Sequence, residues 1–120
     1  MGLRTGIDLT SIERIESVLE QFGERFHRKY FGNLESAYGD VSPRTYAGLW
    51  AVKEAAFKVA GGRCPATAVT VRYRSSGRPE LHVDYDEASL EDSPIPRAAD
   101  WDCSIAHDDG LAVAVAACTW

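Results

Sequence analysis

The sequence contains no uninterrupted apolar run of about 20 residues, the length that a membrane-spanning helix requires. Its start also lacks the basic segment and short apolar stretch that direct proteins to secretion. Cysteine is scarce: Cys64, Cys103 and Cys118 are odd in number and lack metal-ligand spacing, so we expect reduced, structural thiols. These features predict a cytoplasmic protein that has no membrane partner.

Positive charge is also in short supply. The 13 lysines and arginines are outnumbered by 18 acidic residues, which gives a formal net charge of −5. General nucleic-acid binding needs a broad cationic face, so we expect no nucleic-acid partner. The length of 120 residues and the 45% hydrophobic content are those of one small globular domain, which we assign to residues 1–120.

A long helix is predicted between Ser42 and Gly61. Ser42 suits the N-cap, and Pro43 suits the first helical position, where its missing N–H costs nothing. Gly61 can adopt the left-handed conformation that commonly ends a helix. Apolar residues recur at helical spacing in between, so one face of this helix should be buried.

A polar line on this helix has two interpretations. Trp50, Glu54 and Lys58 are spaced four residues apart, so their side chains follow one line. An acid, an ammonium and a large aromatic in line can hold a metal and a phosphate together. The alternative is an ordinary surface pair of Glu54 and Lys58, contributing about 0.2–0.5 kcal/mol, with Trp50 in the core. From this helix alone, the surface pair is the favoured interpretation.

The N-terminal part of the chain predicts a strand followed by a helix. Residues 3–9 should form the strand, which ends at Asp8, and residues 11–22 the helix. Thr10 is the expected N-cap, because Glu13 three residues later would complete a capping box. Asp8 would then lie at a strand end beside a helix N-terminus, where it is either a second cap or a ligand.

The second half of the chain alternates between apolar and polar residues and is expected to form strands. Residues 69–73 and 81–85 form one predicted hairpin, and residues 101–107 and 111–119 form another around an Asp-Gly turn. The last strand is apolar on both faces, so it should be buried centrally. The predicted fold class is α+β, with helices packed on a mostly antiparallel sheet. A short helix or a turn is expected at residues 24–30, and helical turns are expected at residues 33–38 and 86–91.

Three segments resemble the motifs of one family. Residues 50–58, Trp-Ala-Val-Lys-Glu-Ala-Ala-Phe-Lys, are similar to the Trp-x-x-Lys-Glu-Ala-x-x-Lys signature of the 4′-phosphopantetheinyl transferases. Residues 6–9, Gly-Ile-Asp-Leu, resemble the family's first motif, and residues 103–107, Cys-Ser-Ile-Ala-His, resemble its Ser-x-Ser-His strand. The segments occur in the family's order across nearly the whole chain, and the closest resemblance is to the small, single-unit holo-acyl-carrier-protein synthase type.

The resemblance implies the fold and the activity of that type. A member moves the 4′-phosphopantetheine arm of coenzyme A onto a serine hydroxyl of an apo acyl carrier protein, and adenosine 3′,5′-bisphosphate is released. Mg²⁺ is the implied cofactor, with Asp8 and Glu54 as its ligands. Lys58 and His107 complete the implied catalytic group. Coenzyme A is expected to contact Lys58, Gly77, Arg78, Pro79 and His107.

The resemblance also implies a homotrimer that binds coenzyme A between neighbouring subunits. Carrier proteins of this class are acidic, so a local cationic patch should receive them. Arg14 and Arg25 are the implied docking residues. The alternative for these arginines is a solvated face, because several acidic side chains share the region and would weaken a positive field. Those acidic residues are Glu13, Glu16, Glu20 and Glu24.

Several alternatives stay open. The serine proton could be accepted by Asp8, by Glu54 through water, or by His107, which could instead be a half-exposed strand-end residue without a role. Leu49 replaces an arginine that is common in the family, and Ala106 replaces a serine or threonine. These departures suit a catalytically impaired member that binds carrier protein or coenzyme A without turnover. Another alternative is an unrelated α+β module with coincidental matches. The carrier could serve fatty-acid, polyketide or peptide synthesis.

Overall fold

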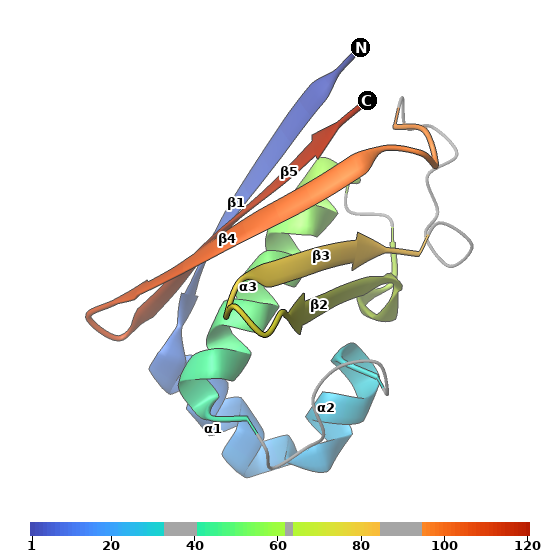
Figure 1. Ribbon diagram of the computed structural model, residues 1–120. Coiled ribbons are helices and arrows are strands. Elements are labelled where there is room, and N and C mark those ends of the chain that lie inside the picture. The colour runs from blue at the N-terminus through green and yellow to red at the C-terminus, as the bar shows by residue number, and fades with distance from the viewer. Residues whose placement is uncertain (33–40, 62–63, 85–94) are drawn as a thin grey trace.

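The computed structural model describes residues 1–32, 41–61, 64–84 and 95–120, and its elements are drawn in Figure 1. The helical turns predicted at residues 33–38 and 86–91 lie outside the described residues. Within those ranges, none of the helices combines the length and apolar character needed to cross a membrane.

The main sheet has three antiparallel strands in the order β1-β5-β4, which are Leu3–Ser11, Leu111–Thr119 and Asp100–Asp108. β4 and β5 form the predicted hairpin around Asp109 and Gly110. These two residues have φ values of 47° and 78°, the left-handed conformation that tight hairpin turns require. β5 is therefore the central strand, as its apolar sequence predicted.

Helix α3, Pro43–Val59, packs lengthwise against one face of this sheet (Figure 1). The inward-facing residues of β5 are small: Ala112, Ala114 and Ala116 are at most 1% exposed. The approach is closest at Gly6 on β1, where an added Cβ would lie 2.2 Å from the carbonyl oxygen of Ala55. Helix and sheet therefore meet at a distance that only small residues permit.

The predicted ends of α3 are confirmed. The hydroxyl of Ser42 accepts a hydrogen bond from the backbone N–H of Thr45 at 3.2 Å, and Pro43 begins the helix. Gly61 follows the helix with a φ of 80°. On the buried face, side chains such as Val52 each contribute about 1.5–3 kcal/mol through burial.

The predicted N-cap of helix α1, Ile12–Phe22, is wrong by one residue. The cap is Ser11, whose hydroxyl accepts from the N–H of Arg14 at 3.2 Å. β1 continues to pair with β5 as far as Ser11, opposite Leu111, so Thr10 stays within the strand. Tertiary pairing thus overrides the local capping-box pattern.

A short helix, a 3₁₀ helix and a second hairpin complete the described part of the fold. Helix α2, Glu24–Tyr30, confirms the short helix expected after Gly23. A short 3₁₀ helix, η1, at Ala66–Ala68 leads into the β2–β3 hairpin, formed by Val69–Tyr73 and Pro79–Val83. The hairpin runs beside α3 and packs near β4 (Figure 1).

The fully buried ammonium of Lys53 ties α3 to this hairpin. It donates hydrogen bonds to the backbone carbonyls of Ala66, at 3.1 Å, and of Val69. It also lies 5.1 Å from the centre of the Phe31 ring. The lysine before Glu54 in the motif therefore anchors the fold.

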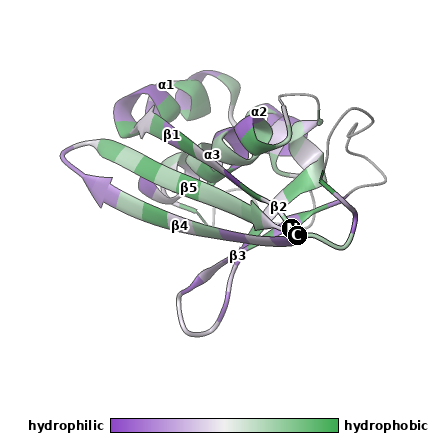
Figure 2. Ribbon diagram, turned by 90° about the horizontal axis from the view of Figure 1, so that it is seen from above, coloured by the Kyte–Doolittle hydropathy of each residue, from purple (hydrophilic) through white to green (hydrophobic). Residues whose placement is uncertain are grey.

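The main sheet is buried on one face only. β5 is coloured as hydrophobic along most of its length in Figure 2, yet its outward side chains are accessible. Val115 is 38% exposed, and its β1 neighbours Ile7 and Leu9 are 62% and 60% exposed. The prediction that β5 is buried on both faces is wrong for the single chain, because no described element covers the outer face.

Candidate active site

Asp8 lies on the inner face of β1, and Lys58 reaches it from α3. The Lys58 ammonium donates to the carbonyl of Ile7 at 2.7 Å and lies 3.3 Å from Oδ1 of Asp8. The side chain of Asp8 is only 16% exposed, whereas that of Lys58 is 55% exposed. The first and second sequence motifs thus meet directly in space.

Glu54 lies one helical turn before Lys58 and is half-buried. Burial raises the pKa of Glu54, and the negative charge of Asp8 raises it further. Lys58 and Arg14 act in the opposite direction, since their positive charges favour the ionised carboxylate. The shift shows that two carboxylates share one partly desolvated site.

A cleft of about 300 Å³ opens beside these carboxylates. Asp8 and Glu54 provide its acidic lining, and Thr10 and Arg14 add a hydroxyl and a guanidinium. The rest of the lining is largely apolar and comes from β1, α1, α2 and α3. These residues are Leu9, Ile15, Val18, Phe26 and Trp50.

The two carboxylates are a suitable donor set for a hard divalent cation. Such a cation prefers oxygen ligands, takes one or two carboxylates, and completes its coordination with waters and phosphate oxygens. No third His, Cys, Asp or Glu joins them in the part of the chain that the structure describes. Asp8 and Glu54 are therefore the residues that could hold the cation.

His107 lies elsewhere, on β4 near the start of α3. Its Nε2 donates to the backbone carbonyl of Arg44 at 3.0 Å, so the proton is on Nε2 in the neutral ring. An added Cβ at Gly48 would lie 3.1 Å from the same nitrogen. His107 does not line the Asp8–Glu54 cleft within the described residues.

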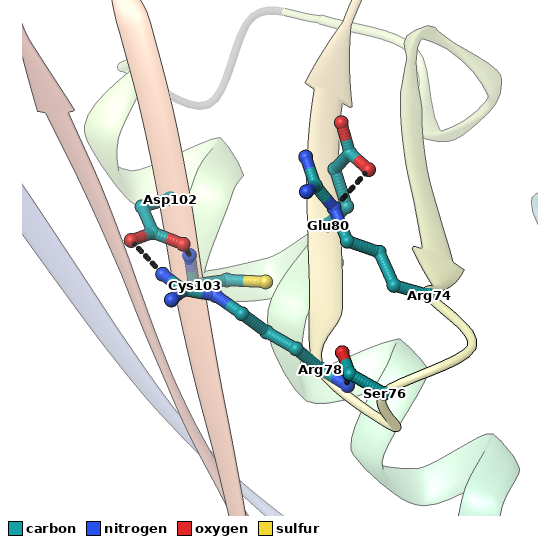
Figure 3. A network of polar contacts seen from close by, with 6 residues as sticks. All are labelled: Arg74, Ser76, Arg78, Glu80, Asp102 and Cys103. Atoms are coloured by element: carbon teal, nitrogen blue, oxygen red, sulfur yellow. Dashed lines mark hydrogen bonds and ion pairs between the residues drawn. The ribbon is translucent and has the colours of Figure 1, made fainter.

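The turn of Gly77, Arg78 and Pro79 joins β2 to β3, and it too lies apart from the cleft. Gly77 has a φ of 85°, which favours glycine there. Arg78 forms an exposed ion pair with Asp102 on β4, 2.7 Å apart (Figure 3). The turn borders a separate cavity of about 580 Å³ between the hairpin and the main sheet.

The two arginines predicted to dock a carrier protein line two neighbouring spaces on the surface. Arg14 lines the acidic cleft, whereas Arg25 lines a neighbouring groove of about 400 Å³ together with Lys29. Trp50 and Phe26 line both spaces. The cleft and the groove therefore share one aromatic wall.

Thr10 is a cleft residue that the sequence did not predict, because the capping-box pattern assigns it to the helix cap. Trp50 also lines the cleft, although the favoured interpretation of the sequence places it in the core. The two-residue spacing of Asp8 and Thr10 on a strand places both side chains on one face, and this signal could have identified Thr10. Leu49, where the family commonly has arginine, is 3% exposed and belongs to the core.

Comparison with known proteins agrees with this fold and motif set. The model of the 4′-phosphopantetheinyl transferase superfamily matches residues 4–116. This match covers nearly all of the chain, which therefore belongs to the 4′-phosphopantetheinyl transferase superfamily.

Relatives define the type within the superfamily, and a solved structure shows the same fold. A holo-[acyl-carrier-protein] synthase of Aliarcobacter butzleri is 33% identical over 114 residues, covering 92% of each chain. One from a Ruegeria species is 42% identical over 105 residues, covering 80% of this chain and 73% of the relative. The structure of the Helicobacter pylori synthase in complex with coenzyme A has a TM-score of 0.81, 24% identity, and coverage of 97% and 100%. The chain is a transferase of the holo-acyl-carrier-protein synthase type.

Proposed function

We propose that this protein transfers the 4′-phosphopantetheine arm of coenzyme A to a serine hydroxyl of an apo acyl carrier protein, in the cytoplasm. The observation that carries the proposal is that Asp8 and Glu54 line one cleft and that Lys58 contacts Asp8 beside it. These are the positions that the family motifs assign to catalysis. The names of the similar synthases support the same substrates.

The reaction is an attack on a pyrophosphate. The serine oxygen forms a bond to the phosphorus that carries the pantetheine arm, and the bond from that phosphorus to the bridging oxygen breaks. Adenosine 3′,5′-bisphosphate leaves with the electron pair, and the serine proton passes to a base. Catalysis of this type depends on positioning and on neutralising charge at phosphoryl oxygens.

The residues of the cleft can supply both requirements. Asp8 and Glu54 would hold Mg²⁺, which contributes neutralisation of phosphate charge when bound. Lys58 would place its ammonium on the same phosphates, a usual role of lysine. The cleft offers Asp8 and Glu54 as acceptors for the serine proton, and His107 is the third candidate.

We further propose that the protein acts as a homotrimer with shared sites. The outer face of the β1-β5-β4 sheet carries exposed apolar side chains, among them Ile7, Leu9 and Val115. A closed symmetric ring is a common way to cover such a face. His107 and the turn of residues 77–79 lie apart from the Asp8–Glu54 cleft in one chain, so a neighbouring subunit could bring them to it.

The carrier protein is proposed to dock over the groove beside the cleft. Arg14, Arg25 and Lys29 place positive charge around apolar walls there, which suits an acidic partner. Arg14→Glu should raise the KM for carrier several-fold and leave coenzyme A binding unchanged. Arg72→Glu on β2 makes the same charge change away from the groove and should leave the KM for carrier near the wild-type value. Equal effects of the two variants would place docking elsewhere.

A direct transfer assay tests the proposed function. The protein is incubated with coenzyme A, Mg²⁺ and an apo acyl carrier protein, and the carrier is weighed by mass spectrometry. A mass increase of one phosphopantetheine arm supports the proposal. Stable binding of coenzyme A or carrier without any mass increase would instead identify the impaired member that the departures at Leu49 and Ala106 suggest.

A further inference from the structure

The two oxygens of the Asp8 carboxylate have different partners. Oδ1 faces the Lys58 ammonium at 3.3 Å, whereas Oδ2 accepts a hydrogen bond from the hydroxyl of Thr10 at 2.8 Å. Thr10 is 7% exposed, which makes it one of few buried polar side chains among the described residues. A hydroxyl this buried has little competition from bulk water for its hydrogen bond.

The strand geometry explains why Thr10 can serve Asp8. Residues two apart on a strand point to the same face, so Thr10 and Asp8 both face inward from β1. Helix α1 is capped by Ser11, so the Thr10 hydroxyl is not engaged at the helix start. Threonine is β-branched and stiff at its first torsion, so the packed side chain holds its hydroxyl in place.

We propose that Thr10 is a positioning residue that orients Asp8 for the metal ion. Its hydroxyl fixes Oδ2, which leaves Oδ1 as the oxygen directed at positive charge, where Lys58 lies. Hydrogen-bond partners of metal-binding carboxylates commonly set ligand orientation, and their loss costs about 10–100-fold in metal affinity. This inference rests on the proposed function, because it assumes that Asp8 binds the metal.

Thr10→Val tests the role because it keeps the size and branching of the side chain and removes the hydroxyl. We expect Mn²⁺ affinity to fall by about tenfold, the lower end of the range for such partners. Thr10→Ser keeps the hydroxyl and loses only the methyl branch, so it should bind Mn²⁺ within about twofold of wild type. Thr67→Val removes an exposed hydroxyl on η1 and serves as the matched control.

The measurement is the electron paramagnetic resonance signal of free Mn²⁺, titrated into each protein with coenzyme A present and carrier absent. No turnover occurs, so the readout does not depend on activity. Equal Mn²⁺ affinity in wild type and Thr10→Val would overturn the inference while leaving the metal site intact. Equal weakening in Thr10→Val and Thr10→Ser would also overturn it, because packing would then be the cause. No Mn²⁺ binding by wild type would overturn the metal part of the proposed function, and this inference with it.

A second readout separates positioning from a general structural effect. In the transfer assay, the Mg²⁺ concentration for half-maximal rate should rise about tenfold in Thr10→Val, in line with the loss of metal affinity. Saturating Mg²⁺ should restore most of the rate. A rate loss that excess Mg²⁺ does not recover would contradict the positioning role. Thr10→Ala provides the same comparison if valine at this position impairs folding.

Discussion

Among single residues, Glu54 has a pKa that is raised mainly by burial and further by the charge of Asp8. Glu54→Gln keeps the size and removes the charge, so the proposed metal site loses one of its two carboxylates. We expect transfer at saturating Mg²⁺ to fall at least ~100-fold, equivalent to about 2.7 kcal/mol of barrier. The exposed Glu16→Gln on α1 is the control, and initial rates of carrier modification provide the measurement.

The stability of Glu54→Gln should be equal to or above that of wild type. The pKa of Glu54 is raised mainly by burial, and Asp8 adds to the shift, so the ionised carboxylate is disfavoured in the folded state. Its charge therefore lowers stability once the pH exceeds the ordinary glutamate range. A near wild-type transfer rate in a well-folded Glu54→Gln protein would remove Glu54 from the site.

His27 predicts a pH dependence of stability that is independent of the active site. Its Nδ1 lies 2.7 Å from the Tyr46 hydroxyl in the core. Burial lowers the pKa of His27, partly offset by the charge of Glu24 and the backbone of Gly32. The unfolded chain therefore binds the proton more readily, so this stability is present above about pH 6.5 and is lost as the pH falls towards the lowered pKa.

The slope of that loss can reach about 1.4 kcal/mol per pH unit for one proton. Urea unfolding between pH 7.5 and 5.5 measures it. The unfolding free energy of His27→Gln should depend less on pH than that of wild type in this window, whereas the exposed His82→Gln on β3 should retain the wild-type slope. An unchanged slope in His27→Gln would assign the pH dependence to another group.

For whole elements, the contact of β1 with α3 determines whether the two motifs meet. An added Cβ at Gly6 would lie 2.2 Å from the Ala55 carbonyl oxygen, a backbone atom next to Glu54. At Gly48 the nearest atoms are side-chain ends, Ile105 Cγ2 at 3.0 Å and His107 Nε2 at 3.1 Å, which can move slightly. A side chain at Gly6 would push β1 away from α3, and this separation would move Asp8 away from Glu54.

Gly6→Ala should lower the free energy of unfolding by about 3 kcal/mol, the upper part of the range for overpacking. Gly48→Ala should cost about 1 kcal/mol, since flexible side chains can relax around it. Urea unfolding of both variants gives the comparison. Similar small losses in the two would mean that β1 and α3 separate easily. Asp8 would be displaced in Gly6→Ala, so Mn²⁺ binding should weaken as well.

Much of this arrangement could be predicted from the sequence because its signals are local. Ser42 and Pro43 specify the start of α3, and Asp109 with Gly110 specifies the β4–β5 turn. The position of Thr10 could not be predicted in this way. Its role depends on how far β1 pairs with β5, a tertiary contact that moved the helix cap to Ser11. The local sequence pattern predicted Thr10 as the helix cap, whereas pairing of β1 with β5 keeps Thr10 in the strand.

The predicted site residues form two groups, those that meet within one chain and those that lie apart from the cleft. Asp8, Glu54 and Lys58 were predicted together only through the family resemblance of their segments, and the structure places Lys58 against Asp8. His107 and Arg78 were predicted as partners of that group, yet the single chain holds them on β4 and on the β2–β3 turn. In the proposed homotrimer a neighbouring subunit would bring them to the cleft. The sequence suggested this arrangement only through the family that it resembles.

At the scale of the assembly, shared sites predict complementation between inactive chains. Glu54→Gln and His107→Ala proteins, refolded together, should regain activity if one subunit provides Glu54 and its neighbour His107. Random association of equal amounts would leave about one quarter of the interfaces with both native residues. The transfer rate of the mixture, compared with wild type, is the measurement.

The control is a mixture of Glu54→Gln with Asp8→Asn, two changes on the same side of the proposed interface. No interface in that mixture has both native carboxylates on one chain, so activity should stay at background. Equal rates in the two mixtures would contradict shared sites, as would a fully active monomer in sedimentation at the assay concentration.

The alternating character of β5 has a consequence for how the chain tolerates random substitution. Inward positions such as Ala114 and Ala116 have almost no exposed surface and face a helix that is already close. An enlarged side chain there would push α3 away, so variants at these positions should be lost at the stage of folding. Outward positions such as Val115 have room for larger residues, so substitutions there should impair assembly of the proposed homotrimer instead. A saturation library of this strand should therefore divide into two classes of defect that alternate from one residue to the next.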